Sequence, residues 1–162
     1  MANLIKVGMA DLKICPPDRG ITTLGLGSCV GVAIRDKDNK QGGLAHVMLP
    51  DSTIMRGSNS NIAKFADTGV MELVRQMEAA GAIRRRMVAK IAGGAKMFSF
   101  ANSSDLMNVG DRNVAAVKKV LKQLNIPILA EDTGLTFGRT VEFFPATGDF
   151  VIKAVGKPVR TI

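Results

Sequence analysis

The stretch TLGLGSCVGVAIRDKDNKQGGLAHVMLP, residues 23–50, organises the rest of the chain. It contains the only histidine, His46, and one of the two cysteines, Cys29. Two apolar runs, 21–26 and 30–34, meet at Cys29, and a third segment of alternating character covers 43–49. Apolar runs separated by glycine-rich turns predict three successive strands, with Cys29 in the turn between the first two.

Cys29 lies in a setting that suits acyl chemistry. Two glycines precede it closely and one follows it, and glycine allows sharp turns and close backbone approach. Such a turn can present a thiol beside backbone N–H groups, here around Gly27, Ser28 and Cys29. Donors of this kind stabilise the oxyanion of a tetrahedral intermediate, and each is worth on the order of 10²- to 10³-fold in rate. The segment is therefore compatible with Cys29 as a nucleophile, with Gly27 and Ser28 in substrate binding.

A cysteine nucleophile also needs a base, because a free thiol with a pKa of about 8.5 is mostly protonated at neutral pH. His46 is the side chain that titrates naturally near neutrality. The polar segment 37–43 predicts a hairpin connection that folds the strand carrying His46 back beside the strand that follows Cys29. On residue types alone, a cysteine in such an apolar setting is more often a small buried hydrophobe than a nucleophile.

Several motifs resemble the CheD family, the chemoreceptor glutamine deamidases. They are TLGLGSCV at 23–30, GGLAHVMLP at 42–50, VAKIAGGAKMF at 88–98, VGDRNV at 109–114 and IPILAEDTGLTFGRT at 126–140. The resemblance covers nearly the whole chain, from about residue 7 to residue 155. We therefore expect one CheD-like deamidase domain over residues 1–162, and this length suits a single domain with a real core.

The resemblance implies a site and a set of partners. The nucleophile of the family falls on Cys29, its base on His46, and the hydroxyl that orients the histidine on Thr23, six residues before Cys29. Thr22 is adjacent but does not have the matching spacing. The implied substrates are glutamines on the cytoplasmic helices of methyl-accepting chemoreceptors, converted to glutamate through a cysteine thioester in chemotaxis adaptation. The implied second partner is the chemotaxis phosphatase CheC.

Composition narrows the remaining classes. The net charge of +8 favours an acidic partner, but the basic residues are spread out except at 84–86, aromatics make up 4%, and no nucleic-acid motif is present, so we expect no nucleic acid. There is no signal-peptide pattern and no apolar run of about 20 residues, which predicts a cytoplasmic protein without membrane insertion. No CxxC or histidine cluster predicts a metal or other cofactor. We interpret Cys15, which precedes two prolines, as structural or incidental.

The pattern predicts an α+β fold with a layered mixed β-sheet core and outer helices. Further strands are expected at 5–14, 87–91, 126–131, 140–144 and 150–155, and helices from Ser60 or Asn61 to Gly81 and from Asp111 or Arg112 to Leu124. The first helix has one apolar stripe, formed by Ile62, Phe65, Ala66, Val70, Leu73, Val74 and Met77. The resemblance implies the architecture of the cytotoxic necrotizing factor type of cysteine hydrolase.

Two other functions remain open at this level. The chain could be a chemotaxis binding module that docks on receptors or CheC with little catalysis, or another cysteine hydrolase such as a peptidase or a receptor methylesterase. For docking, we expect contributions from a mobile loop at 51–59 and from the segment 96–98, in which Phe98 is the apolar residue. A core position for Phe98 is an equally good interpretation. Close backbone packing is the expected role of Gly93 and Gly94, which lack the spacing of a phosphate-binding loop.

Overall fold

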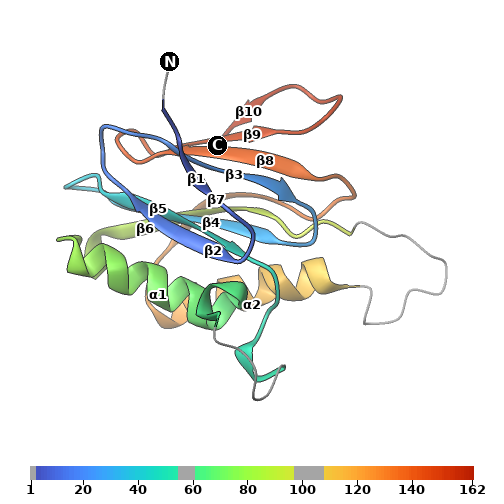
Figure 1. The fold of residues 1–162 in the computed structure, drawn as a ribbon, viewed down its shortest axis with the longest axis horizontal. Coiled ribbons are helices and arrows are strands. Elements are labelled where there is room, and N and C mark those ends of the chain that lie inside the picture. The colour runs from blue at the N-terminus through green and yellow to red at the C-terminus, as the bar shows by residue number, and fades with distance from the viewer. Residues whose placement is uncertain (1–2, 55–60, 97–107) are drawn as a thin grey trace.

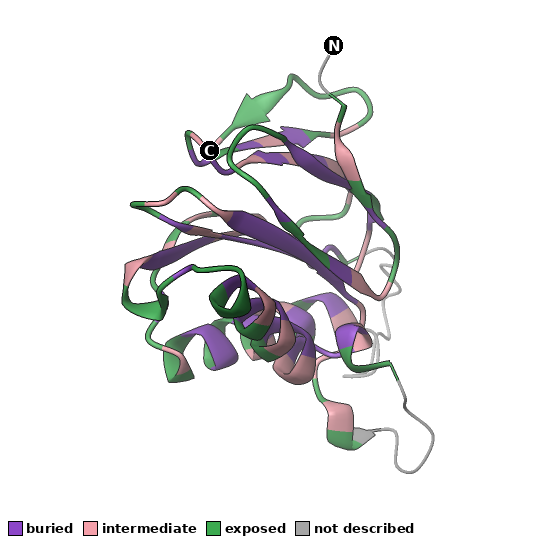
Figure 2. Cartoon of the chain, turned by 60° about the vertical axis from the view of Figure 1, so that its left-hand side comes forward, coloured by how far each residue is buried: buried purple, intermediate pink, exposed green. Residues whose placement is uncertain are grey.

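The computed structural model describes residues 3–54, 61–96 and 108–162, which form three layers (Figure 1). Two five-stranded sheets stack face to face, and the helices cover the outer face of the second sheet. Figure 2 shows that the second sheet, in the middle, is buried along most of its strands. The predicted α+β class with layered mixed sheets and outer helices is confirmed.

The outer sheet contains the strands β1 (Ile5–Val7), β3 (Ile21–Leu26), β8 (Arg139–Phe144), β9 (Asp149–Lys153) and β10 (Arg160–Thr161), in that order. The middle sheet has the order β2 (Asp11–Cys15), β5 (Gly42–Val47), β4 (Val30–Asp36), β6 (Met87–Gly93) and β7 (Ile128–Thr133). The pairs β1–β3 and β6–β7 are parallel, and the other pairs are antiparallel, so both sheets are mixed.

The middle sheet is apolar on both faces because each face meets another layer. Successive side chains of a strand point to opposite faces. On β4 and β5, Ala33 and Leu44 pack into the core between the sheets, whereas Val32, Ala45 and Val47 pack into the core against the helices. This double burial accounts for the nearly continuous apolar runs by which these strands are recognised in the sequence.

Two α-helices, α1 (Ala66–Ala79) and α2 (Val109–Gln123), lie side by side against the middle sheet (Figure 1). Among the described residues there are also three short 3-10 helices, Ser52–Ile54, Ile62–Lys64 and Arg84–Arg86. The first predicted helix is thus divided: Asn61 caps the turn at 62–64 through its side chain, and α1 begins only after Phe65. Ile62, which we expected in the buried stripe, is 46% exposed, because it precedes the helix proper.

The predicted strand at 5–14 is wrong as one element. The structure has two strands there, β1 and β2, which belong to different sheets. Between them the chain turns at Ala10, whose φ of 53° lies in the left-handed region that non-glycine residues rarely adopt. The other predicted strands are present with ends shifted by a few residues, and the short strand β10 was not predicted.

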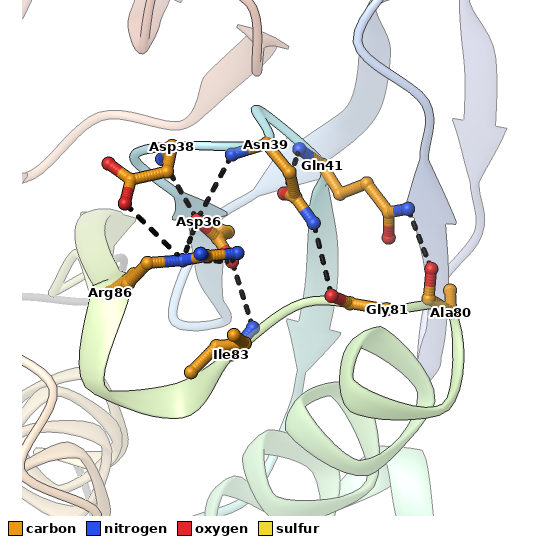
Figure 3. A network of polar contacts seen from close by, with 8 residues as sticks. All are labelled: Asp36, Asp38, Asn39, Gln41, Ala80, Gly81, Ile83 and Arg86. Atoms are coloured by element: carbon orange, nitrogen blue, oxygen red, sulfur yellow. Dashed lines mark hydrogen bonds and ion pairs between the residues drawn. The ribbon is translucent and has the colours of Figure 1, made fainter.

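The hairpin between β4 and β5 forms as predicted, and a buried carboxylate organises it (Figure 3). Asp36 accepts hydrogen bonds from the backbone N–H groups of Asp38 and Ile83, at 2.9 and 2.8 Å. The Arg86 guanidinium donates to both of its oxygens, with Nη2 2.8 Å from Oδ2. Asp36 therefore ties the β4–β5 hairpin to the connection between α1 and β6, at the end of β4 far from Cys29.

Candidate functional site

Cys29 lies in the turn that carries the chain from the outer sheet to the middle sheet. β3 ends at Leu26 in one sheet, and β4 begins at Val30 in the other. Gly25 has a φ of 71°, which a residue with a Cβ rarely adopts, and its carbonyl accepts the N–H of Gly27 at 3.1 Å. The predicted sharp turn is present, and Cys29 is 8% exposed at its end.

His46 is brought to the same region by the strand register. It lies on β5 directly opposite Gly31 of β4, and directly opposed residues project to the same face of a sheet. Cys29 precedes Gly31 by two residues and packs with the core between the sheets, so it is on that face as well. Both side chains therefore project into the space between the two sheets, and the predicted pairing of β4 with β5 places them on the same face.

Thr23 reaches His46 from the facing sheet. Its Oγ1 lies 2.7 Å from Nδ1 of His46, and both residues are completely buried. The neighbouring Thr22 instead donates to the carbonyl of Val141 at 2.7 Å. The structure therefore brings Thr23, and not Thr22, against the histidine.

The contacts of Thr23 determine the tautomer of the imidazole. Its hydroxyl has a single proton, and its Oγ1 also lies 2.8 Å from the carbonyl oxygen of Val7, which can only accept. The hydroxyl therefore donates to Val7 and accepts from His46, so Nδ1 bears the proton. Nε2 is then the unprotonated nitrogen, which is the one that can act as a base.

Burial keeps the histidine neutral. Burial lowers the pKa of His46, and the carboxylate of Asp11, which lies opposite His46 on β2, opposes this effect without reversing it. Nε2 is buried and has no hydrogen-bond partner among the described residues. An unpaired buried acceptor costs stability, and a catalytic role is one reason for such a group to be retained.

The thiol is neutral as well. Burial raises the pKa of Cys29, and the backbone N–H of the same residue acts in the opposite direction. A raised cysteine pKa and a lowered histidine pKa favour a neutral thiol beside a neutral imidazole over a preformed ion pair. This arrangement suits proton transfer that accompanies attack on a substrate.

Hydrogen bonds hold the carbonyl groups of Gly27, Ser28 and Cys29, which form the turn around the nucleophile. The Gly27 carbonyl accepts from the N–H of Ala95 and the Cys29 carbonyl from the N–H of Gly94, both at 2.8 Å. The Ser28 carbonyl accepts from Nδ2 of Asn113 at 2.9 Å. A Cβ on Gly93 would collide with the Cys29 carbonyl oxygen. The expected close packing at residues 93–94 is confirmed, and it fixes the turn.

The sequence did not single out Asn113. It lies within the quoted segment VGDRNV, on the buried side of α2, but helix periodicity does not distinguish an asparagine that faces a turn from one that only packs. Gly27 also differs from expectation, because its own N–H is occupied by Gly25. Of the donors expected around the thiol, the N–H groups of Ser28 and Cys29 are those without a partner in the described parts of the chain.

The second cysteine has a different environment. Cys15 is buried on β2, and its thiol donates to the carbonyls of Pro16 and Arg19 at 3.4 and 3.3 Å. Burial raises its pKa to about 11, and neither cysteine forms a disulfide. These contacts support a structural role for Cys15.

The expected docking segments are described only in part. Of the loop at 51–59, the residues 51–54 are described, and Ser52 is held by the carboxylate of Asp67 at 2.9 Å. The backbone N–H of Lys96 donates to the carbonyl of Leu135 at 2.8 Å, and Phe98 lies outside the described residues.

Within 3–54, 61–96 and 108–162, no three His, Cys, Asp or Glu side chains gather as ligands for a metal ion. In the same ranges, neither α-helix has the length and apolar character needed to span a bilayer.

Comparisons with known proteins agree with the motifs in the sequence. Residues 48–154 match the family model described as CheD chemotactic sensory transduction. The chain is 57% identical to the "Probable chemoreceptor glutamine deamidase CheD" of Lachnoclostridium phytofermentans, and the match covers the full length of both proteins. It is 52% identical, again over both full lengths, to the chemoreceptor glutamine deamidase CheD of Halalkalibacterium halodurans. The protein of the same name from Bacillus subtilis is 47% identical over 99% of this chain and 97% of its own.

Proposed function

Because this chain belongs to the CheD family, we propose that it is a chemoreceptor glutamine deamidase that uses Cys29 as nucleophile, His46 as base and Thr23 as the residue that orients the base. The observation that carries the proposal is the contact of Thr23 with Nδ1 of His46 at 2.7 Å. This contact leaves Nε2 as a buried base without a partner among the described residues, on the same face of the sheet as the thiol.

The first half of the reaction forms a thioester. Nε2 of His46 takes the thiol proton of Cys29 while the sulfur attacks the carboxamide carbon of a receptor glutamine. The carbonyl oxygen becomes an oxyanion, and the nearby backbone N–H groups of Ser28 and Cys29 are the donors available to stabilise it. His46 then returns the proton to the leaving nitrogen, and ammonia departs.

The second half hydrolyses the thioester. Nε2 accepts a proton from water, the resulting nucleophile attacks the thioester carbonyl, and glutamate and the free thiol are released. Thr23 keeps the imidazole in the required tautomer throughout. A neutral hydroxyl stabilises an imidazolium less than a carboxylate does, so we expect modest turnover.

The partners follow from the same family membership. Methyl-accepting chemoreceptors present their signalling helices in the cytoplasm, so we place the reaction there, in chemotaxis adaptation. The phosphatase CheC is a proposed second partner. The net charge of +8 favours acidic helical surfaces of this kind over neutral ones.

Mass spectrometry of a purified receptor signalling domain, incubated with this protein, tests the proposal. Deamidation replaces a side-chain NH₂ by OH at specific glutamines and releases ammonia, and Cys29→Ala should abolish both changes. Loss of methyl ester from glutamate would indicate a methylesterase, and cleaved backbone would indicate a peptidase. Receptor binding without any change of mass would indicate a docking module instead.

A further inference from the structure

Asn113 of α2 lies against the turn that holds the nucleophile. Its Nδ2 donates to the Ser28 carbonyl and to the Met48 carbonyl, both at 2.9 Å, and its side chain is fully buried. Ser28 directly precedes Cys29 in the sequence, and Met48 lies two residues after His46. One amide group therefore joins the turn of Cys29 to the end of the strand that positions His46.

The hydrogen bond to Ser28 has a consequence for the neighbouring N–H group. The carbonyl of Ser28 and the N–H of Cys29 belong to the same peptide unit, which is planar and trans, so the two groups point in opposite directions. Holding the carbonyl toward α2 therefore fixes the direction of the Cys29 N–H away from α2. This N–H has no hydrogen-bond partner on another residue in the described ranges.

Packing alone does not account for an asparagine at this position. Oδ1 of Asn113 is buried and has no hydrogen-bond partner among the residues described. An unsatisfied buried acceptor is costly, and an apolar side chain of similar size would avoid that cost. The two donated hydrogen bonds are what an asparagine supplies here and a leucine does not.

We propose that Asn113 is a positioning residue that holds the Ser28–Cys29 peptide so that the Cys29 N–H is directed at the oxyanion formed on a substrate carboxamide. The inference rests on the proposed function, because it requires Cys29 to be the nucleophile. It adds a residue outside the Thr23, His46 and Cys29 set, on an element that the reaction otherwise does not use.

The test compares two reactions of the same thiol. Attack on a carboxamide forms an oxyanion, whereas alkylation of the thiol by iodoacetamide is a displacement that forms none. We expect Asn113→Leu to lower kcat for receptor deamidation by about 10²-fold, the effect of one lost oxyanion donor. The rate of Cys29 alkylation and the KM should change less than about threefold.

A destabilising control separates positioning from folding. Val120→Ala removes apolar contacts of the same helix without touching the turn, because Val120 packs in the core under the middle sheet. It should lower the thermal midpoint and leave kcat within about threefold. If Asn113→Leu does not fold, Asn113→Ala removes both N–H donors without adding a bulky apolar side chain.

The possible outcomes separate the positioning role of Asn113 from the proposed function. A wild-type kcat in a folded Asn113 variant would overturn the positioning role while leaving the proposed function intact. An equal fall in alkylation and deamidation would also overturn it, because the defect would then lie in the thiol or its access. Full activity in Cys29→Ala would instead overturn the proposed function itself.

Discussion

Thr23 and His46 lie in different sheets, yet Oγ1 of the threonine is 2.7 Å from Nδ1 of the histidine. The contact crosses the core between the sheets, where neither side chain is exposed. Each sheet thus contributes one residue, and the turn between the sheets contributes Cys29. The relative placement of the two sheets therefore determines the geometry of the candidate site.

Removal of the nucleophile or the base should abolish deamidation without unfolding the protein. We expect Cys29→Ala and His46→Ala each to reduce receptor deamidation to background, because the two groups act as a unit. Ammonia release measures the rate, and circular dichroism checks the fold. Cys15→Ala should retain nearly wild-type activity; a loss there, with activity retained in Cys29→Ala, would move the nucleophile to Cys15.

The hydroxyl of Thr23 should affect turnover more than binding. A neutral hydrogen bond contributes about 1 kcal/mol, so Thr23→Ala should lower kcat by roughly five- to tenfold through loss of the fixed tautomer. KM for the receptor fragment should stay close to the wild-type value. Thr22→Ala is the matched control, since its hydroxyl bonds Val141 instead. Equal losses in both variants would argue against an orienting role for Thr23.

The strand periodicity and the turn residues predicted most of the elements of this fold. They predicted β3, β4 and β5 and therefore the proximity of Cys29 and His46. They did not predict the break between β1 and β2, because the left-handed position of that turn is occupied by Ala10, and the single glycine nearby, Gly8, does not mark a turn on its own. The partner of His46 followed from family resemblance alone, since no local pattern shows that β3 faces β5 across two sheets.

The contacts of Asn113 are a second feature that the sequence alone does not predict. Its position on the inward side of α2 is consistent with helical periodicity, but the carbonyls that it binds belong to residues 85 and 65 positions away in the chain. Contacts of this range depend on how the layers stack. Side-chain type and spacing do not encode them locally.

The pH dependence of the reaction should reflect the buried histidine. Catalysis requires neutral His46, so activity should fall as the pH falls through its pKa, and burial lowers that pKa below the ordinary value of about 6.5. The acid limb of the kcat/KM profile should therefore lie below pH 6.5. Asp11→Asn should move it to still lower pH, because the Asp11 carboxylate raises the histidine pKa. An upward shift in that variant would contradict the assignment.

The hydrogen bonds of Asp36, at the end of β4 far from Cys29, should make a large contribution to the loss of stability in acid. Burial alone would raise the pKa of Asp36, but the Arg86 guanidinium and the backbone N–H groups around it lower the pKa well below its usual value of about 3.9. A carboxylate with a lowered folded-state pKa contributes stability above the unfolded pKa, and this contribution is lost as the pH falls through the folded pKa.

Substitution isolates that contribution. Asp36→Asn should lower the free energy of unfolding at neutral pH by about 3 kcal/mol, because it leaves the arginine without its buried partner. Urea titration at pH 7 and at pH 3 should show that the difference from wild type shrinks at the lower pH. Asp38→Asn, whose carboxylate is mostly exposed, should change stability little. A pH-independent deficit in Asp36→Asn would show that packing, not charge, is responsible.

Receptor association should depend on salt, whereas the chemistry of the thiol should not. The net charge of +8 attracts acidic helices over a Debye length of about 8 Å at physiological ionic strength, and added salt shortens that range. Raising the salt concentration should lower the association rate in stopped-flow or surface-binding measurements and leave iodoacetamide alkylation of Cys29 nearly unchanged.

Two substitutions test where the charge acts. Arg112 is exposed and directly precedes Asn113, which contacts the turn of Cys29, so Arg112→Glu should slow association and weaken its salt dependence. Lys37→Glu makes the same change of charge at the β4–β5 hairpin, at the far end of β4 from Cys29, and should have the smaller effect. Equal effects of the two substitutions would show that the overall charge, and not a local surface near the site, steers the receptor.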